Sequence, residues 1–135
     1  MKRIVNRDNV ENQIFSWGQI YWLCEPRYSG TTSMEFGFIT INGGEGHDTH
    51  THDGADEILY VVEGEGIQTI NEEGNVTKQD VKPGDMIYIP ADVPHSTFNK
   101  SQTEKMVLIG VYQKPGTAAA LRETAIDFEP PKEEI

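Results

Sequence analysis

The sequence predicts an all-β protein, folded as an antiparallel sandwich or barrel in one domain. The first supporting observation is a succession of roughly seven to nine short runs rich in apolar, β-branched and aromatic residues, separated by glycine or proline. The second is the length of 135 residues, which suits one domain and leaves no room for a second sizeable one. No apolar run approaches the ~18 residues of a spanning helix, so we expect no membrane segment.

The predicted strands follow one another in order along the chain, with turn signals between them. Gly43-Gly44 closes the first strand, residues 72–75 have the composition of a hairpin turn, and Pro83-Gly84 marks a later turn. The expected strands are residues 33–42, 58–63, 67–71, 76–81, 86–89, 95–99 and 105–113.

Only two stretches have the composition of short helices, residues 9–16 and residues 117–124. Residues 126–135 contain four acidic residues, one lysine and Pro130-Pro131. We expect this end of the chain to be an extended or frayed tail.

The charge of the chain argues against two classes of partner. There are 22 acidic and 11 basic residues, which give a formal net charge of −11. Phosphate backbones and anionic lipid surfaces would be repelled, so we expect no nucleic-acid and no membrane partner. Residues 1–8 are basic at first, but no apolar stretch of signal-peptide length follows, which predicts a cytoplasmic protein.

Cys24 is the only cysteine. An internal disulfide is therefore excluded, as is a cysteine-rich zinc or iron–sulfur site. The apolar neighbours of Cys24 predict a buried, unreactive thiol.

Three of the four histidines belong to one pattern. His50 and His52 are two positions apart, so on a strand both imidazoles point to the same face. Glu57 follows after a short loop and opens the next strand, and His95 begins a later strand. Three neutral imidazoles and one carboxylate form a mixed donor set that suits divalent Fe, Mn, Co, Ni, Cu or Zn.

The spacing of these residues resembles the two motifs of the cupin family. The first is Gly44-x5-His50-x-His52-x4-Glu57-x6-Gly64, which matches the family pattern throughout. The resemblance implies that the two glycines occupy turn or bulge positions where a Cβ is unwelcome.

The second motif is Gly84-x5-Pro90-x-Asp92-x2-His95-x3-Asn99. It departs from the family pattern at Asp92, where cupins usually have glycine. Aspartate tolerates left-handed backbone angles better than most residues, so we expect the turn to persist. The resemblance implies structural roles for Pro90 and Asn99.

The resemblance implies a jelly-roll barrel of two sheets, with one divalent transition metal held in its mouth by His50, His52, Glu57 and His95. Cupins include dioxygenases, decarboxylases, sugar isomerases, lyases, storage proteins and ligand sensors, so the fold does not give the reaction. We expect an enzyme of the dioxygenase, isomerase, lyase or decarboxylase type that acts on a small polar metabolite. No catalytic acid or base is assigned. The alternatives are a cupin that binds or senses a sugar or organic acid without turnover, and a protein with a structural metal.

The resemblance covers residues 44–99 by motif and about residues 34–113 by strand pattern, and it implies a homodimer. We divide the chain into an N-terminal strand and dimerisation segment (1–33), the β-barrel (34–115), and a short helix with an acidic tail (116–135). Trp17 and Trp22 are the candidates for the dimer interface.

Strand parity gives expectations for residues near the site. His47 has the opposite parity to His50 and is expected to be an exposed loop residue, with a contact to a metal ligand or to the substrate as the alternative. Asp48 shares the parity of His50 and is a candidate to point inward. Alternation from His95 turns Thr97 inward.

Parity also bears on the core. Met34, Phe36 and Phe38 alternate with polar residues or glycine, which predicts that these three side chains face the core. The strand at residues 86–89 is apolar on both faces, so the pair that faces the metal is left open. An inward Tyr88 would place a phenol near the site as a candidate acid.

Overall fold

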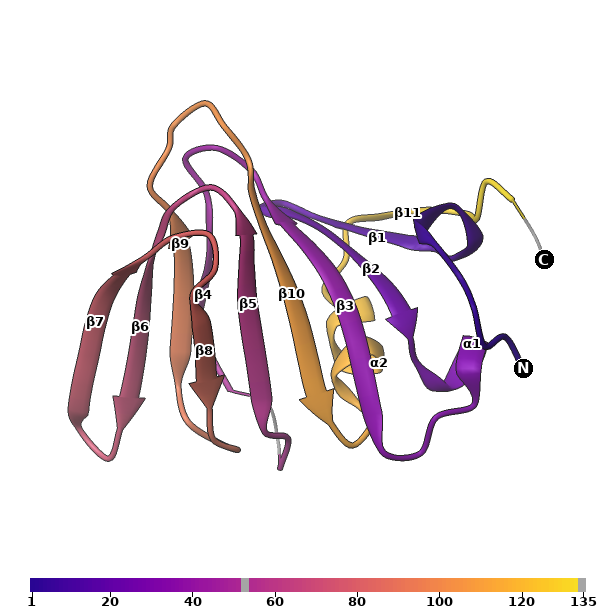
Figure 1. Cartoon of the computed structure of the whole chain (residues 1–135), viewed down its shortest axis with the longest axis horizontal. Coiled ribbons are helices and arrows are strands. Elements are labelled where there is room, and N and C mark those ends of the chain that lie inside the picture. The colour runs from indigo at the N-terminus through magenta and orange to yellow at the C-terminus, as the bar shows by residue number, and fades with distance from the viewer. Residues whose placement is uncertain (52–53, 134–135) are drawn as a thin grey trace.

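The computed structural model describes residues 1–51 and 54–133, and it contains two antiparallel sheets (Figure 1). The larger sheet has the strand order β11-β1-β2-β3-β10-β5-β8, and the smaller has the order β4-β9-β6-β7. The predicted all-β, two-sheet jelly roll is therefore confirmed. The elements are η1 (Arg7–Asn9), β1 (Asn12–Phe15), β2 (Gly18–Cys24), α1 (Pro26–Ser29), β3 (Met34–Ile41), β4 (Gly46–His50), β5 (Glu57–Glu63), β6 (Gly66–Glu72), β7 (Asn75–Val81), β8 (Met86–Ile89), β9 (His95–Asn99), β10 (Met106–Gln113), α2 (Thr117–Arg122) and β11 (Asp127–Glu129).

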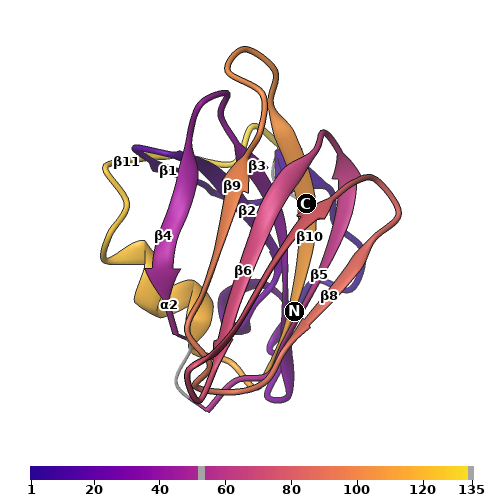
Figure 2. The ribbon, with the colours of Figure 1, turned by 90° about the vertical axis from the view of Figure 1, so that its left-hand side faces the viewer.

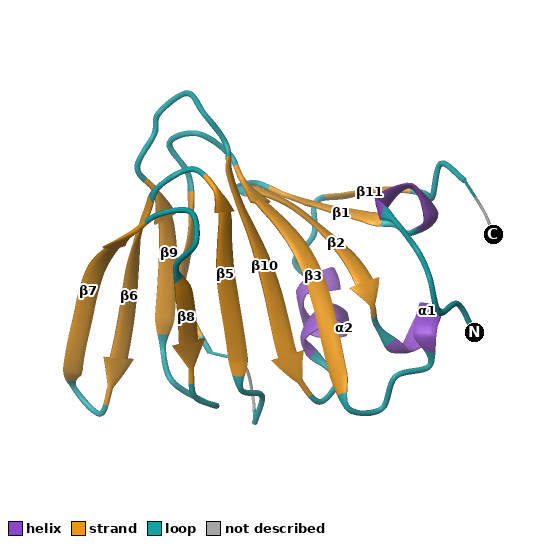
Figure 3. Cartoon of the chain, in the orientation of Figure 1, coloured by secondary structure: helices purple, strands orange, loops and turns teal. Residues whose placement is uncertain are grey.

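The middle of the chain follows the sequence prediction closely. Strands β3 and β5 to β10 lie where they are expected, because each is either an alternating or a continuous apolar run that ends at a turn. The helix predicted at residues 117–124 is present as α2. As Figure 3 shows, strands dominate the fold, and no helix among residues 1–51 and 54–133 is long and apolar enough to cross a membrane.

The prediction of a helix at residues 9–16 is wrong. The 3₁₀ helix η1 ends at Asn9, and most of the remaining residues form strand β1. β1 pairs with β2 on one side and with β11 on the other, so neighbouring strands satisfy the backbone groups that a helix would bond internally. The C-terminal tail is extended rather than frayed over residues 127–129, where it forms β11.

The core lies between the two sheets, and the predicted orientation of β3 is wrong. Met34 is 51% exposed, and Phe36 and Phe38 are half-buried on the outer face of the larger sheet. The inward positions hold Glu35 and Gly37 instead. A Cβ on Gly37 would lie 3.2 Å from the Trp22 ring, so the indole of β2 fills the space that a β3 side chain would otherwise take. With 1% exposure, Trp22 is a core residue of the single chain and is not available to a dimer interface.

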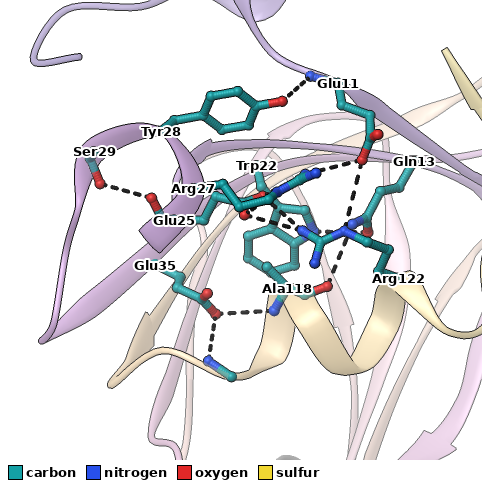
Figure 4. Close-up of polar contacts among 11 residues, drawn as sticks. Glu11, Gln13, Trp22, Glu25, Arg27, Tyr28, Ser29, Glu35, Ala118 and Arg122 are labelled. Carbon is teal, nitrogen blue, oxygen red and sulfur yellow. Dashed lines mark hydrogen bonds and ion pairs between the residues drawn. The ribbon is translucent and has the colours of Figure 1, made fainter. Parts of the chain in front are cut away.

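Polar contacts fix α2 against the barrel (Figure 4). The buried Glu35 carboxylate accepts hydrogen bonds from the backbone N–H groups of Ala118 at 3.0 Å and Gly116 at 3.3 Å. At the other end of α2, Arg122 donates to both oxygens of Glu25, each at 3.1 Å. These contacts hold α2 against the larger sheet, behind β3 in Figure 1 and across a hollow from β4 (Figure 2).

Candidate metal centre

Three of the four predicted ligands come together at one end of the barrel. His50 ends β4 and His95 begins β9, and the two residues face each other in the register of the smaller sheet. Glu57 begins β5 in the larger sheet. The cluster therefore joins the two sheets. The fourth residue, His52, lies outside the described residues.

The contacts of the three residues are short, and Glu57 and His95 are shielded from water whereas His50 is half-buried. Nε2 of His95 lies 3.0 Å from Oε1 of Glu57, and these side chains are 2% and 3% exposed. The rings of His50 and His95 have centroids 4.1 Å apart. Each imidazole donates from Nδ1 to a backbone carbonyl, His95 to Val93 at 2.9 Å and His50 to Asp48 at 2.7 Å. These bonds fix the tautomers whose Nε2 atoms carry the lone pair.

The electrostatics of the His95–Glu57 pair favour a proton or a cation between Nε2 of His95 and Oε1 of Glu57. Burial by itself lowers the pKa of His95, but the hydrogen bond and the negative charge of Glu57, with the Val93 carbonyl, outweigh burial and raise it. A neutral His95 with Nδ1 bonded to Val93 would direct its Nε2 lone pair at a carboxylate oxygen. Because the lone pairs repel, either a proton or a cation must lie between them.

Tyr112 extends the cluster, and sequence reasoning missed it. It is 3% exposed and opposite Glu57 in the pairing of β10 with β5. Burial, the charge of Glu57 and a hydrogen bond to Glu57 raise the pKa of Tyr112 well above its usual value. The Tyr112 phenol therefore stays protonated, and its hydroxyl hydrogen-bonds to the Glu57 carboxylate. The alternation of Leu108, Gly110 and Tyr112 along β10 was the signal that could have placed it inside.

The donor chemistry of the cluster fits a divalent transition metal. Two ligand atoms at right angles, each about 2.1 Å from one cation, are about 3.0 Å apart, which is the separation of the His95 and Glu57 atoms. Within residues 1–51 and 54–133, however, no group of three or more His, Cys, Asp or Glu side chains could hold a metal ion on its own. The sequence motif alone supplies His52 to this set.

A small cavity of about 30 Å³ lies against the cluster. Its walls are mostly apolar. They are formed by Trp17, Ile20, Ile39, Ile41, His47, His50, Glu57, Leu59, His95, Thr97, Leu108, Tyr112 and Leu121. A wider hollow of about 560 Å³ lies outside it, between β4 and the end of α2. Trp17, His47, His50 and Leu121 line both spaces and form the boundary between them.

The prediction that His47 is an exposed loop residue is wrong. The pairing of β4 with β9 shifts register between His47 and His50. Because of this irregularity, the strict alternation of side chains does not hold between the two histidines. His47 is half-buried and lines the cavity. Its ring stacks on His50 at 3.8 Å and on Trp17 at 4.7 Å between centroids. Trp17, proposed for a dimer interface, is thus a wall of the cavity.

Three other expectations near the site are resolved. Thr97 is buried and lines the cavity as predicted, and its hydroxyl donates to Gln68. Asp48, a candidate to point inward, is exposed instead, and its backbone carbonyl accepts the hydrogen bond from Nδ1 of His50. Tyr88 is 50% exposed on the outer face, because Ile87 and Ile89 occupy the inward positions of β8. Tyr88 is therefore not an acid of this site.

Three residues that are not proposed ligands test further expectations from the sequence, two from the second motif and one about the cysteine. Asp92 has a φ of 64°, the left-handed conformation that its motif position demands. Asn99 has the structural role implied for it, since its side chain bonds three backbone carbonyls. Cys24 is half-buried rather than fully buried, with its Sγ 3.3 Å from Oγ of Ser29.

Comparison with known sequences places these features in a family. The family model of the cupin domain matches residues 37–112. An uncharacterised protein of Methanocaldococcus jannaschii is 38% identical over 63 residues, which are 47% of this chain and 47% of that protein. Acireductone dioxygenase of Alcanivorax borkumensis is 32% identical over 68 residues, which are 50% of this chain and 36% of the enzyme. The chain thus spans about half, or less, of the length of these relatives.

Solved structures share the fold at low sequence identity. A Bacillus subtilis oxalate decarboxylase superposes with a TM-score of 0.75 at 20% identity, over 89% of this chain and 32% of that one. The oxalate decarboxylase of Lactobacillus farciminis, in complex with formate, gives a TM-score of 0.72 at 16% identity, over 79% and 32%. The family match covers more than half of the sequence and the fold agrees with it, so the chain belongs to the cupin family.

Proposed function

We propose that this cupin is a metal-dependent enzyme that holds one divalent transition metal ion through His50, His52, Glu57 and His95. The observation that carries the proposal is the buried contact between His95 and Glu57, with the His50 ring beside it. A carboxylate and two imidazoles converge there, and these are donor groups that divalent transition metals bind. His52 enters the set through the spacing of its motif.

The roles of the surrounding residues follow from their contacts. A bound ion would act as a Lewis acid on an oxygen atom of the substrate. The carbonyls of Val93 and Asp48 keep the two imidazoles in the tautomer that directs Nε2 into the site. Tyr112 donates to Glu57 and orients it. The apolar walls exclude water, which strengthens every electrostatic interaction inside.

The two connected spaces indicate the shape of the substrate. The inner cavity of about 30 Å³ admits only a small oxygen-bearing group, whereas the outer hollow has room for the rest of a metabolite. No described residue that lines either space is lysine or arginine, and Glu45 and Asp48 border the outer one. We therefore propose a substrate whose body is neutral or cationic rather than a dianion.

The named relatives indicate which reactions to assay first. The curated relative of known activity is a dioxygenase, and the fold neighbours are decarboxylases, one of them with Mn(II) centres. Oxygen consumption and carbon dioxide release are therefore the first readouts. Binding of a metabolite without turnover would favour the alternative of a sensing or carrier cupin.

Elemental analysis of the protein, purified without a nickel column, tests the metal site. We expect about one transition metal ion per chain, lost in His50→Ala and in His95→Ala. His47→Ala is the matched control, because this histidine lines the cavity but is not a proposed ligand. Failure of the wild type to bind Fe, Mn, Co, Ni, Cu or Zn even after reconstitution would overturn the proposal.

A further inference from the structure

A second pocket lies at the seam between the two sheets. β7 is the last strand of the smaller sheet and β8 is the last strand of the larger one, and the two do not pair with each other (Figure 1). The space between them has a volume of about 270 Å³, and it shares no described lining residue with the cavity beside the proposed metal ligands. We call this space the seam pocket; its polar lining residues are Gln68, Thr77, Gln79 and Asp85.

The side of β7 that faces the opposite sheet carries polar side chains in place of core residues. Gln79 lies opposite the buried Gln68, and Thr77 lies opposite Ile70, in the pairing of β7 with β6. Residues that lie opposite each other point to the same face of a sheet, so Thr77 and Gln79 occupy inward positions. Both are nevertheless exposed. The seam is therefore open to solvent, and a ligand can reach it.

The seam pocket combines an apolar floor with polar walls. Val81 and Ile87 belong to the hydrophobic core, and Ile70 packs against it. The charged side chains of β7, Lys78 and Asp80, alternate with the inward ones and so lie on the opposite face of the strand. No described residue that lines the pocket is lysine or arginine. The pocket therefore offers no cation to an anionic ligand.

Gln68 is a buried amide with a donor to spare. It is 3% exposed, and its Oε1 accepts a hydrogen bond from the Thr97 hydroxyl. Its Nε2 donates to the carbonyl of Thr69 at 3.4 Å. An amide nitrogen has two N–H groups, and the second donates to no group within residues 1–51 and 54–133. Because Gln68 lines the seam pocket, an oxygen atom in the pocket can supply the acceptor.

Asp85 supplies a fixed acceptor where the chain enters β8. Its Oδ2 accepts from the backbone N–H of Lys82 at 2.9 Å, and its Oδ1 lies 3.4 Å from Nζ of the same lysine. A carboxylate has about four acceptor sites, so Asp85 can accept a further bond from a ligand. The Lys82 ammonium offsets the charge of Asp85, which makes the pocket a poor site for a cation.

We propose that the seam pocket binds a neutral, hydroxyl-rich small molecule, of the class of monosaccharides and cyclic polyols. A hydroxyl group both donates and accepts, so such a ligand can accept from Gln68, donate to Asp85 and do either with Gln79. Its C–H groups would pack on the apolar floor. The volume of about 270 Å³ lies near the lower end of the range of small-molecule sites, which suits a ligand of this size.

Gln68 also connects the seam pocket to the cavity at the metal centre. Gln68 and Thr97 lie opposite each other in the pairing of β6 with β9, and Thr97 lines that cavity. A ligand bonded to one end of the Gln68 amide polarises the hydrogen bond at its other end. Occupancy of the seam pocket is thus felt at Thr97. Both parts of the inference involve described residues other than the proposed metal ligands, so they do not depend on the proposed function.

Two-dimensional NMR of the ¹⁵N-labelled chain tests the proposal, with D-glucose, D-ribose and myo-inositol as the probes. We expect at least one of them to move the side-chain amide signals of Gln68 and Gln79 saturably, with a Kd below about 10 mM. The backbone amide signal of Thr97 should move with the same Kd. If the Gln68 signals move and the Thr97 signal does not, the connection to the cavity is excluded.

Two substitutions on β7 locate the site. Gln79→Ala removes a wall of the seam pocket and should weaken binding at least tenfold. Lys78→Ala, on the opposite face of the same strand, is the matched control and should leave the Kd unchanged. The dispersion of the backbone amide signals establishes that both variants fold. The proposal is overturned if none of the three probes gives a saturable shift up to about 100 mM, or if the two variants bind equally. Tighter binding of D-glucuronate or D-glucosamine than of every neutral probe would also overturn it.

Discussion

Asn99 joins the end of β9 to three separate backbone segments. Its Nδ2 donates to the carbonyls of Glu104 at 2.7 Å, Ile41 at 3.2 Å and Asn42 at 3.3 Å. Its Oδ1 accepts from the N–H of Ser101 at 2.9 Å. One amide therefore satisfies backbone groups that would otherwise be buried without partners.

Replacement of Asn99 by alanine should lower the free energy of unfolding by about 2–3 kcal/mol, because several buried carbonyls lose their donor. Urea unfolding measures the change. Asn75→Ala on the exposed strand β7 is the control and should change stability by less than about 0.5 kcal/mol. Equal effects of the two substitutions would contradict the role assigned to Asn99.

Asp92 occupies a backbone conformation that favours glycine. Its φ is 64°, and its Oδ1 accepts from the N–H of Gly54 at 2.9 Å. Asp92→Ala should be less stable than Asp92→Gly by about 1 kcal/mol, because both lose the hydrogen bond but only alanine retains the Cβ strain. Thermal unfolding of the two variants compares them directly. Identical stabilities would mean that this turn relaxes.

At the scale of elements, α2 is a short helix that depends on its anchors. It has six residues, too few to be stable alone. Glu25 is 2% exposed and is paired with both Arg27 and Arg122. Leu121, next to Arg122, lines the boundary between the cavity and the outer hollow. The anchors of α2 thus determine how the mouth of the site is closed.

Arg122→Ala should release the end of α2 while Arg27 still compensates Glu25. We expect a loss of about 1–2 kcal/mol of stability, because the lost pair is partly exposed. Hydrogen exchange at the backbone N–H of Ala120 should become faster. The exposed Lys78→Ala on β7 is the control for loss of a cation, and equal exchange in both variants would exclude an anchoring role.

Glu35, the other anchor, should give the fold a specific pH dependence. Burial raises its pKa above 4.5, although the N–H groups of Ala118 and Gly116 oppose the shift. Between 4.5 and the raised value the folded chain binds more protons than the unfolded chain, so the Glu35 contribution to stability falls as pH rises. The stability of Glu35→Gln relative to the wild type should therefore increase as pH rises from about 4 to 7. Denaturant unfolding across this range measures it, and a constant difference would refute it.

At the scale of the whole molecule, the core extends beyond the residues that line the cavity. Val61 and Met106 are fully buried between the sheets and do not line the cavity, whereas His50, Glu57 and His95 lie at one end of the barrel. Chelation of the metal should therefore lower the melting temperature without removing the β-sheet signal in circular dichroism. Unfolding on chelation would show that the metal is structural.

Much of this architecture can be predicted from the sequence, because strands and turns are determined mainly by residues close together in the chain. Alternating or continuous apolar runs and turn residues locate β3 and β5 to β10, and the motif spacing identifies His50, Glu57 and His95 as neighbours. Non-local effects cause the errors. Trp22 of β2 takes the space inside Gly37, which turns Phe36 and Phe38 outward.

The other errors have similar causes. A register shift in β4 brings His47 to the cavity, and no local pattern signals it. Asn12 and Gln13 are polar yet buried, because Gln19, Glu129 and Ala118 bond them from distant parts of the chain. Period-two alternation therefore fails to predict burial where residues from a distant strand or helix supply the hydrogen-bond partners of a polar side chain.

The pairing of β1 with β11 has a mechanical consequence. Asn12, where the chain enters β1, lies opposite Glu129, where it leaves β11. A pulling force applied before β1 and after β11 would load the pair at this one end, so its hydrogen bonds would break one after another, as in a zipper. The larger sheet would yield first at this edge under low force, while β3, β10 and β5 still enclosed the cavity.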